Sequence, residues 1–252
     1  MRESTLLNNS NQSFDIDTWY QTQLGQTVLK LEQQQLRVLP RVMFNKNLVQ
    51  LGATSQSVSG LNMPATHLFL VSTNPSKQCS TNRVQSTFEQ LPFPNDSAHT
   101  VILPHVLEFQ IDPKIILTEA WRILEPDGHL VILGFNPWSL WGLAKQTLNL
   151  PDHAKLHSMG KLNYWLAGLN AEIVLKRSFL FAPPFSNLKT IDTLQNSEKA
   201  LTWLFPNNGG IFLLIAKKQI LPLTPIRIRW NWREFLTGKP LTEPAAGNVQ
   251  RG

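Results

Sequence analysis

The sequence predicts an α/β fold with a doubly wound, mostly parallel β-sheet, on the strength of three observations. From residue 48 onward, short apolar runs alternate with segments of helical periodicity, which is the order expected of βαβ units. The run HLVILG at residues 129–134 is apolar on both faces, as in a central strand covered on both sides. A helix that begins at Asp112, with Pro113 in its first turn, separates this run from the preceding one. Together these features indicate a Rossmann-like sheet with helices on both faces.

Residues 1–44 are expected to form a helical extension in front of the sheet. Residues 1–14 are polar and rich in Asn, Ser and Gln. Residues 16–39 then place apolar and aromatic side chains at near-helical spacing, and Pro40 ends the pattern. We expect one or two amphipathic helices that pack on the following domain as a cap.

Residues 45–218 hold the expected strands and helices of the main domain. The helix after Asp112 has a buried stripe, and a second helix is predicted at residues 159–169. A turn is predicted at residues 126–128, Pro-Asp-Gly, before the central strand. The strands are expected at residues 48–52, 67–72, 83–87, 99–103, 129–134, 171–176 and 210–216.

Composition excludes several classes of protein. Cys79 is the only cysteine among 252 residues, so no intrachain disulfide framework can form. The longest apolar runs fall well short of the roughly 18–20 residues of a membrane span. The polar start lacks the apolar core of a secretory signal. The sequence therefore predicts a soluble, cytoplasmic protein.

The net charge of +6 is concentrated near the C-terminus. Residues 217–252 contain seven Lys and Arg against two Glu, a net charge of +5. Residues 219–252 are expected to form a basic, proline-containing tail, and residues 226–233 alternate apolar side chains with Arg and Asn. This stretch could be an edge strand on the core, a ribbon that binds RNA or an acidic membrane surface, or a segment that docks on a protein.

Residues 88–136 contain an ordered series of motifs. The series resembles that of the class I S-adenosylmethionine-dependent methyltransferases of the type 11 group, and the wider similarity runs over residues 45–218. Residues 134–145 also look like those of a small bacterial subgroup of that family. The matching residues are Glu89, Leu91, Pro92, Phe93, Pro94, Ser97, His105, Val106, Leu107, Glu108, Asp112, Pro113, Arg122, Leu124, Pro126 and Gly128.

The resemblance implies S-adenosylmethionine as cofactor and a direct attack of an acceptor of unknown class on its methyl group. It implies a cofactor site at three turns and at the end of the fourth strand. This sequence departs from the family pattern: one glycine, Gly52, remains in the first turn, Ser72 stands where an acid is usual, and so does Thr87. A catalytically degenerate fold that serves as a binding or scaffold module is therefore the alternative function. The implied cofactor residues are Gly52, Ala53, Ser72, Thr73, Thr87, Phe88, Leu103, Pro104 and His105.

Two groups of residues are candidates for contact with the acceptor. His105 follows the fourth strand and could deprotonate a nucleophile, or it could only pack the turn with Glu108. Asn136, Trp138 and Trp141 follow the fifth strand, at the rim where open α/β sheets bind ligands. The two tryptophans could form an aromatic wall for substrate or could face the core. No metal site is predicted: His157 and the Asp-His pair at residues 152–153 lack a third ligand and are expected in a solvated loop.

Overall fold

The computed structural model describes residues 16–44, 46–52, 64–73, 82–144, 154–181 and 208–219. The chain divides into two compact units, Met1–Ile220 and Leu221–Gly252. The second unit, with the basic tail, lies outside the described residues, as does Cys79. The predicted domain boundaries at residues 44 and 218 stay predictions.

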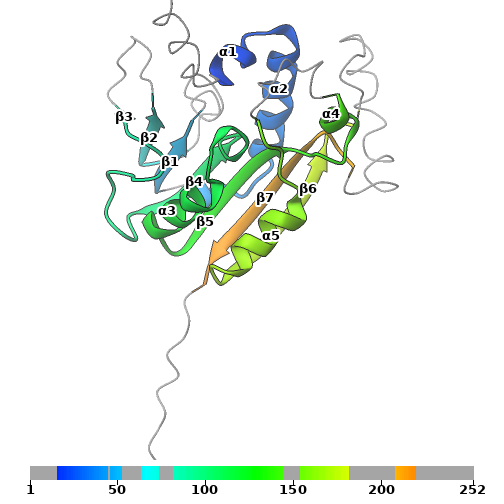
Figure 1. Ribbon diagram of the computed structural model, residues 1–252. Helices are drawn as coiled ribbons and strands as arrows, with labels where there is room; N and C mark the ends of the chain where they lie inside the picture. The colour runs from blue at the N-terminus through cyan, green and yellow to red at the C-terminus, as the bar shows by residue number, and fades with distance from the viewer. Residues whose placement is uncertain are drawn as a thin grey trace, which may run out of the picture. The chain divides into compact units, whose positions relative to one another are not determined.

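A seven-stranded sheet with the order β3-β2-β1-β4-β5-β7-β6 forms the centre of the first unit (Figure 1). The first five strands are parallel, and β7 runs antiparallel to both of its neighbours. This confirms the mostly parallel, doubly wound sheet that the sequence predicts. The strands are β1 (Asn47–Leu51), β2 (His67–Ser72), β3 (Arg83–Gln85), β4 (Ala98–Pro104), β5 (Leu124–Phe135), β6 (Ala171–Phe179) and β7 (Ile211–Lys218).

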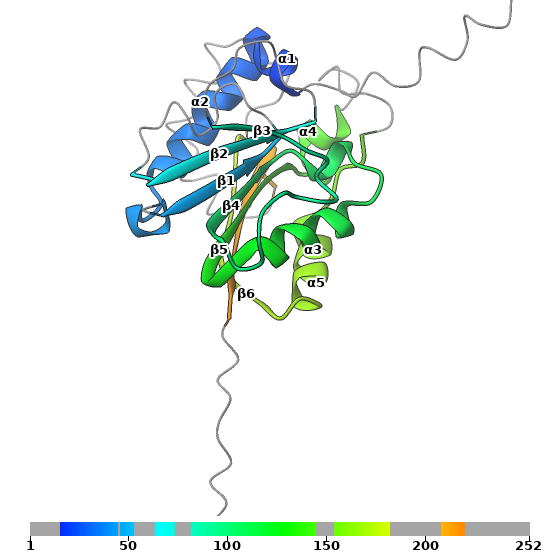
Figure 2. The same ribbon diagram turned by 90° about the vertical axis from the view of Figure 1, so that its left-hand side faces the viewer.

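Helices cover both faces of this sheet (Figure 2). On one face, α1 (Ile16–Tyr20) and α2 (Gln23–Arg37) bury an apolar stripe against β4, β5, β6 and β7. On the other face lie α3 (Pro113–Ile123) and α5 (Met159–Ala167). The side chain of Asp112 accepts a hydrogen bond from the Lys114 amide at 3.0 Å, which caps α3 as its sequence position predicts. A short helix, α4 (Leu140–Leu143), follows β5.

The turn predicted at residues 126–128 is an irregularity inside β5 and does not precede the strand. Ala98 pairs with Leu124 and Thr100 pairs with His129, so the intervening residues of β5 loop out of the ladder. Asp127 has a φ of 64° within this loop. A Cβ on Gly128 would lie 2.7 Å from the carbonyl oxygen of Glu125, so only glycine fits there.

Two of the C-terminal cations are bound to the sheet domain and are not part of a free tail. Lys217 of β7 pairs with Asp127 at 2.8 Å, and Lys218 pairs with Asp96 at the same distance. Lys218 also donates to the carbonyl oxygens of Trp121 and Leu124. Five Lys and Arg against two Glu then remain in residues 219–252, a net charge of +3 instead of +5.

No helix among the described residues is long and apolar enough to cross a membrane.

Candidate functional site

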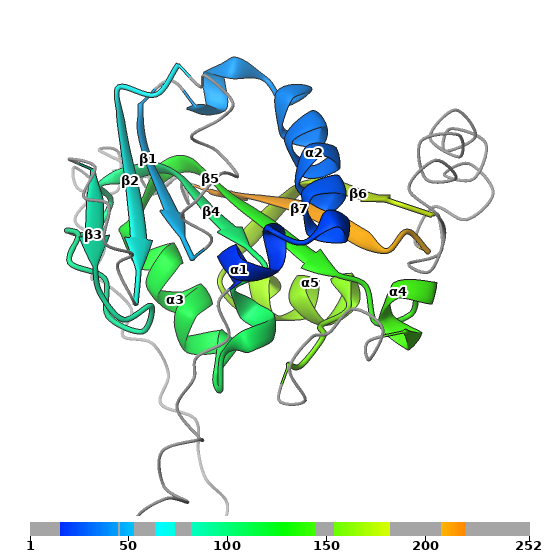
Figure 3. The same ribbon diagram turned by 90° about the horizontal axis from the view of Figure 1, so that it is seen from above.

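The candidate site lies at the carboxyl ends of the parallel strands. The chain runs outward from β1 to β3 and then returns to β4, so the strand order reverses between β1 and β4. Open α/β sheets bind ligands in the crevice at such a switch point. Seen from above, α1 lies over the ends of β4 and β5 at this edge (Figure 3).

Gly52 occupies the turn after β1, with a φ of +71°. A Cβ at this position would lie 2.8 Å from Cγ2 of Val106 and 4.0 Å from both the Phe88 ring and the Pro104 carbonyl oxygen. The structure therefore brings together Gly52, Phe88 and Pro104, three of the cofactor residues that the family resemblance implies. Both the left-handed backbone and this close packing favour glycine.

The other expected cofactor residues lie along the same edge. Ser72 ends β2 beside Gly52, since the Gly52 amide donates to the carbonyl oxygen of Val71 at 3.0 Å. Thr73 and Thr87 are exposed. Leu103 is fully buried near the end of β4, so only its backbone can face the crevice. Ala53 lies outside the described residues.

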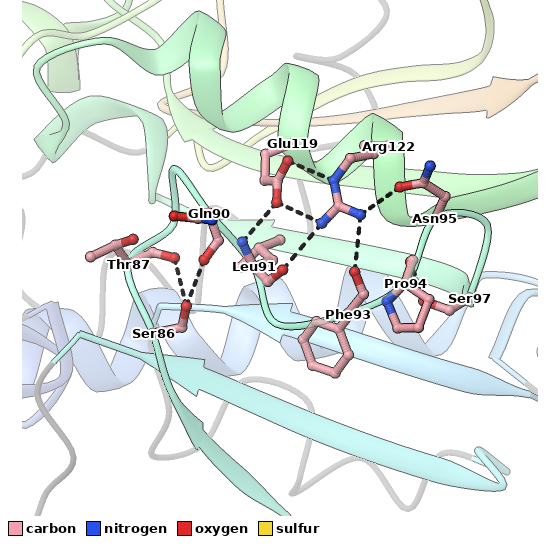
Figure 4. A network of polar contacts seen from close by, with 10 residues as sticks. All are labelled: Ser86, Thr87, Gln90, Leu91, Phe93, Pro94, Asn95, Ser97, Glu119 and Arg122. Carbon is pink, nitrogen blue, oxygen red and sulfur yellow. Dashed lines mark hydrogen bonds and ion pairs between the residues drawn. The ribbon is translucent and has the colours of Figure 1, made fainter.

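An arginine of α3 holds the Leu-Pro-Phe-Pro loop that follows Phe88 (Figure 4). The Arg122 guanidinium donates to the carbonyl oxygens of Leu91 and Phe93 at 3.1 and 3.0 Å, and to Oδ1 of Asn95 at 2.7 Å. It also pairs with both carboxylate oxygens of Glu119, and one of these accepts the Leu91 amide at 2.7 Å.

The charges of Arg122 and Glu119 support the hydrogen bonds of this network. The hydrogen bond from Arg122 lowers the pKa of Glu119, so the carboxylate stays charged and continues to accept the loop amide. Arg122 and Glu119 are three residues apart on one helix, and together they satisfy backbone groups of a loop that precedes them by about thirty residues.

His105 follows β4 and has no exposed surface. Its Nε2 lies 2.7 Å from Oε1 of Glu32 on α2, and its Nδ1 lies 3.3 Å from Oε1 of Glu108. The Tyr20 hydroxyl of α1 donates to Oε2 of Glu32 at 2.7 Å. The same Glu108 oxygen accepts the Phe135 amide at 2.8 Å, while Oε2 of Glu108 is buried without a hydrogen-bond partner among the described residues.

The two carboxylates keep His105 protonated. Burial lowers the pKa of His105, but Glu32 and Glu108 outweigh this effect and raise it from 6.5 to about 10. An imidazolium with both N–H groups engaged has no lone pair to accept a proton from a nucleophile. The geometry therefore favours packing of the turn over the base role that the sequence also allows.

The structure separates the two tryptophans at the rim. Trp141 is 1% exposed and packs in the core against Gly210, whereas Trp138 is 77% exposed. Asn136 is buried, and its side chain donates to the Gly209 carbonyl oxygen and accepts the Trp138 amide. Of the three residues predicted to contact substrate, Trp138 presents its side chain to solvent. Trp141 faces the core, which is the alternative that the sequence left open for it.

His157 is buried, which differs from the solvated loop expected for it. It is 5% exposed, its ring packs edge-on against Trp165 at 5.1 Å, and burial lowers its pKa. In the part of the chain that the structure describes, no group of three His, Cys, Asp or Glu could hold a metal ion. The Asp-His pair at residues 152–153 lies outside that part.

Sequence patterns do not identify Tyr20, Glu32 or Glu119 as residues of the site. The sequence does mark Glu32 as unusual. It lies four residues after Val28 and four before Leu36, so it is an acid on the apolar stripe of α2. A charged residue in such a stripe indicates a buried partner. Nothing in the sequence indicated that this partner is His105.

Comparisons with known proteins agree with this geometry. The sequence pattern of the family described as "Methyltransferase domain" matches residues 46–132. The uncharacterized protein YafS of Escherichia coli (strain K12) is 30% identical over 212 residues, which cover 82% of this chain and 83% of that protein. This chain belongs to the class I S-adenosylmethionine-dependent methyltransferase family.

Solved structures of methyltransferases share the fold of this family member. A methyltransferase of Thermotoga maritima has a TM-score of 0.58 at 17% identity, with 81% of this chain and 94% of that chain covered. One of Archaeoglobus fulgidus has a TM-score of 0.56 at 19% identity, with 75% and 94% covered.

Membership of the methyltransferase family implies S-adenosylmethionine as the cofactor, in agreement with the resemblance of the motifs. The crevice of this methyltransferase fits that group at its glycine turn. Gly52 turns the backbone in the left-handed region at the carboxyl end of β1, with Val106 packed on the side where a Cβ would lie.

Proposed function

We propose that this chain transfers the methyl group of S-adenosylmethionine to an acceptor at the crevice between β1 and β4. The observation that carries the proposal is Gly52, held at a φ of +71° at the end of β1 and packed against Val106 after β4. This left-handed glycine turn lies at the switch point of a doubly wound sheet, where such sheets bind ligands.

In this proposal the chain binds and aligns the cofactor and does little acid–base chemistry. The cofactor supplies an activated methyl group on a sulfonium, which is a good leaving group. Gly52 would allow close approach by the ligand, with Ala53 as an expected neighbour outside the described residues. The hydroxyls of Ser72 and Thr73 would contact the ribose, and Thr87 and Phe88 would lie at the adenine. The backbone at Leu103 and Pro104 forms the facing wall.

The acceptor would reach the crevice past the exposed rim after β5. Trp138 is the side chain available there for stacking on an acceptor, because Trp141 and Asn136 are buried. His105 would orient the turn and would not remove the acceptor's proton.

Calorimetry of the full chain with S-adenosylhomocysteine tests cofactor binding. At about 100 times the Kd, a ligand stabilises the fold by about 2.7 kcal/mol, which gives a clear thermal shift. Transfer of a labelled methyl group into separate pools of small metabolites, RNA and proteins then identifies the acceptor class. The absence of both binding heat and thermal shift at millimolar ligand would exclude the enzyme.

That negative outcome would favour the alternative, a methyltransferase fold that serves as a binding module. The observation that favours the alternative is the chemistry of the ribose and adenine positions. Ser72 and Thr87 offer hydroxyls where charged acceptors are usual in the family, and each lost charge-assisted hydrogen bond costs about 1–2 kcal/mol of binding free energy.

The basic tail is proposed to bind an anionic partner, RNA or an acidic membrane surface. Residues 219–252 carry a net charge of +3 when the paired lysines of β7 are left out, and this charge supports attraction of an anionic partner. Removal of residues 221–252 should abolish salt-sensitive binding to RNA or to acidic vesicles, and a full-length chain that binds neither at low salt would contradict this. The cytoplasmic location stays a prediction.

A further inference from the structure

A buried ion pair joins the N-terminal helices to the turn after β4. Glu32 and His105 are separated by 73 residues in sequence, both side chains are 0% exposed, and their atoms Oε1 and Nε2 lie 2.7 Å apart. Buried ion pairs add little net stability compared with well-packed apolar residues, because both charges lose their hydration. A geometric role explains this pair better than a contribution to stability does.

The backbone of His105 needs external support. Its φ is +53°, in the left-handed region where a residue with a side chain costs about 1–2 kcal/mol. Contacts from three directions hold it: Glu32 from α2, Glu108 from the 3₁₀ helix η3 (Leu107–Phe109), and the Leu133 carbonyl of β5, which accepts the His105 amide at 2.9 Å.

The turn that His105 occupies lies across the switch point from Gly52. Pro104 and Val106, its direct neighbours, are the residues that face the Gly52 turn across the switch point. A change in the orientation of His105 therefore moves the atoms that a ligand at Gly52 would meet. A displacement of this kind is enough to change ligand affinity.

Tyr20 completes the connection from α1. Its hydroxyl occupies the second oxygen of Glu32 at 2.7 Å, and its ring lies 6.4 Å from the His105 imidazole in an edge-on arrangement. Trp19 packs beside it against Phe135 at 5.6 Å. The groups facing His105 are thus Tyr20, Glu32 and Glu108, and the centroid of the tilted Phe135 ring lies 4.2 Å from that of the imidazole.

We propose that Glu32 and Tyr20 are positioning residues, which act through His105 to fix residues 104–106 as a wall of the cofactor crevice. The N-terminal helices are then a working part of the binding site, although no cofactor motif lies in them. The effect on cofactor affinity rests on the proposed function, whereas the effect on the turn does not.

The test uses the full-length chain with Glu32→Gln and Tyr20→Phe. Calorimetry with S-adenosylhomocysteine should show affinity weakened by about tenfold or more in each, as expected when one oriented hydrogen bond is lost. Imidazole ¹⁵N spectra, assigned with His105→Gln, should show both ring nitrogens of wild-type His105 protonated from about pH 6 to 9, and titration within this range in Glu32→Gln. The titration reports the contact between Glu32 and His105, and the affinity for S-adenosylhomocysteine reports the effect of that contact on the cofactor site.

The matched control is Glu172→Gln, which removes an exposed carboxylate from β6, at the opposite edge of the sheet from β3. Its affinity should stay within about twofold of wild type. Equal affinity in wild type, Glu32→Gln and Tyr20→Phe would overturn the proposal, and so would a wild-type His105 that titrates near its ordinary value. If Glu32→Gln does not fold, the affinity of Tyr20→Phe decides between the outcomes, because this variant keeps every charge.

The positioning role can be tested even if the proposed function is wrong. If the wild-type chain binds no S-adenosylhomocysteine, the amide resonances of Gly52 and Val106 decide the positioning role. They should shift in Tyr20→Phe and stay in place in Glu172→Gln, and unchanged resonances in both variants would overturn the proposal.

Discussion

Nε2 of His105 lies 2.7 Å from Oε1 of Glu32, and neither side chain has exposed surface. The pair joins α2, which precedes the sheet, to the turn after β4 at the carboxyl ends of the parallel strands. It explains how an N-terminal extension without cofactor motifs can influence the site. It also accounts for the protonated state of His105, because an imidazolium is the form that two carboxylates stabilise.

The pH dependence of stability should reveal this protonation. The pKa of His105 is raised to about 10 in the folded chain from its ordinary 6.5. Its contribution to folding is therefore complete below about pH 6.5, declines between pH 6.5 and 10, and is lost above 10. Urea midpoints measured from pH 6 to 10 should fall more steeply for wild type than for Glu32→Gln. Parallel curves for the two proteins would contradict the assignment.

Gly52→Ala should destabilise the fold and weaken cofactor binding together. The φ of +71° and a Cβ placed 2.8 Å from Val106 predict a loss of about 1–3 kcal/mol in unfolding free energy. Gly160→Ala is the matched control, because the nearest atom to its Cβ, Oγ of Ser158, lies 3.9 Å away. In α5 the same change should be neutral or stabilise by up to about 1 kcal/mol. Denaturant unfolding and calorimetry measure both effects.

Arg122→Gln should loosen the loop that follows Phe88. The variant loses the hydrogen bonds to Leu91, Phe93 and Asn95 and leaves Glu119 without its cation. We expect a loss of about 1–3 kcal/mol in unfolding free energy and faster amide exchange at Leu91. Arg41→Gln, which removes an exposed guanidinium, should change stability by less than about 0.5 kcal/mol. Equal losses in the two variants would argue against the network.

Replacing each tryptophan of the rim should separate packing from substrate contact. Trp141→Ala empties a core position that is 1% exposed and should cost about 3–5 kcal/mol of unfolding free energy. Trp138→Ala should leave stability within about 0.5 kcal/mol. Once an acceptor is known, Trp138→Ala should raise the KM for it and leave the Kd for S-adenosylhomocysteine unchanged. An unchanged KM would remove Trp138 from the acceptor site.

Local patterns in the sequence predict most of the fold. The strands of the sheet were identified from short apolar runs, and α3 from its cap at Asp112 and the apolar stripe that follows. Strands and helices depend on backbone periodicity and on neighbours within a few residues, which are directly visible in a sequence. The family resemblance implies one site for Gly52, Phe88 and Pro104, and the structure brings these residues together.

The pairings that set the chemistry of individual side chains depend on the tertiary structure. Trp138 and Trp141 are three residues apart, yet one is exposed and the other is a core residue, because α4 turns only one of them toward Gly210. From the sequence alone His105 is a candidate base, but the fold places Glu32 of α2 beside it. A side chain's charge state depends on the groups around it in space, and chain folding brings those groups together across distances that local periodicity does not encode.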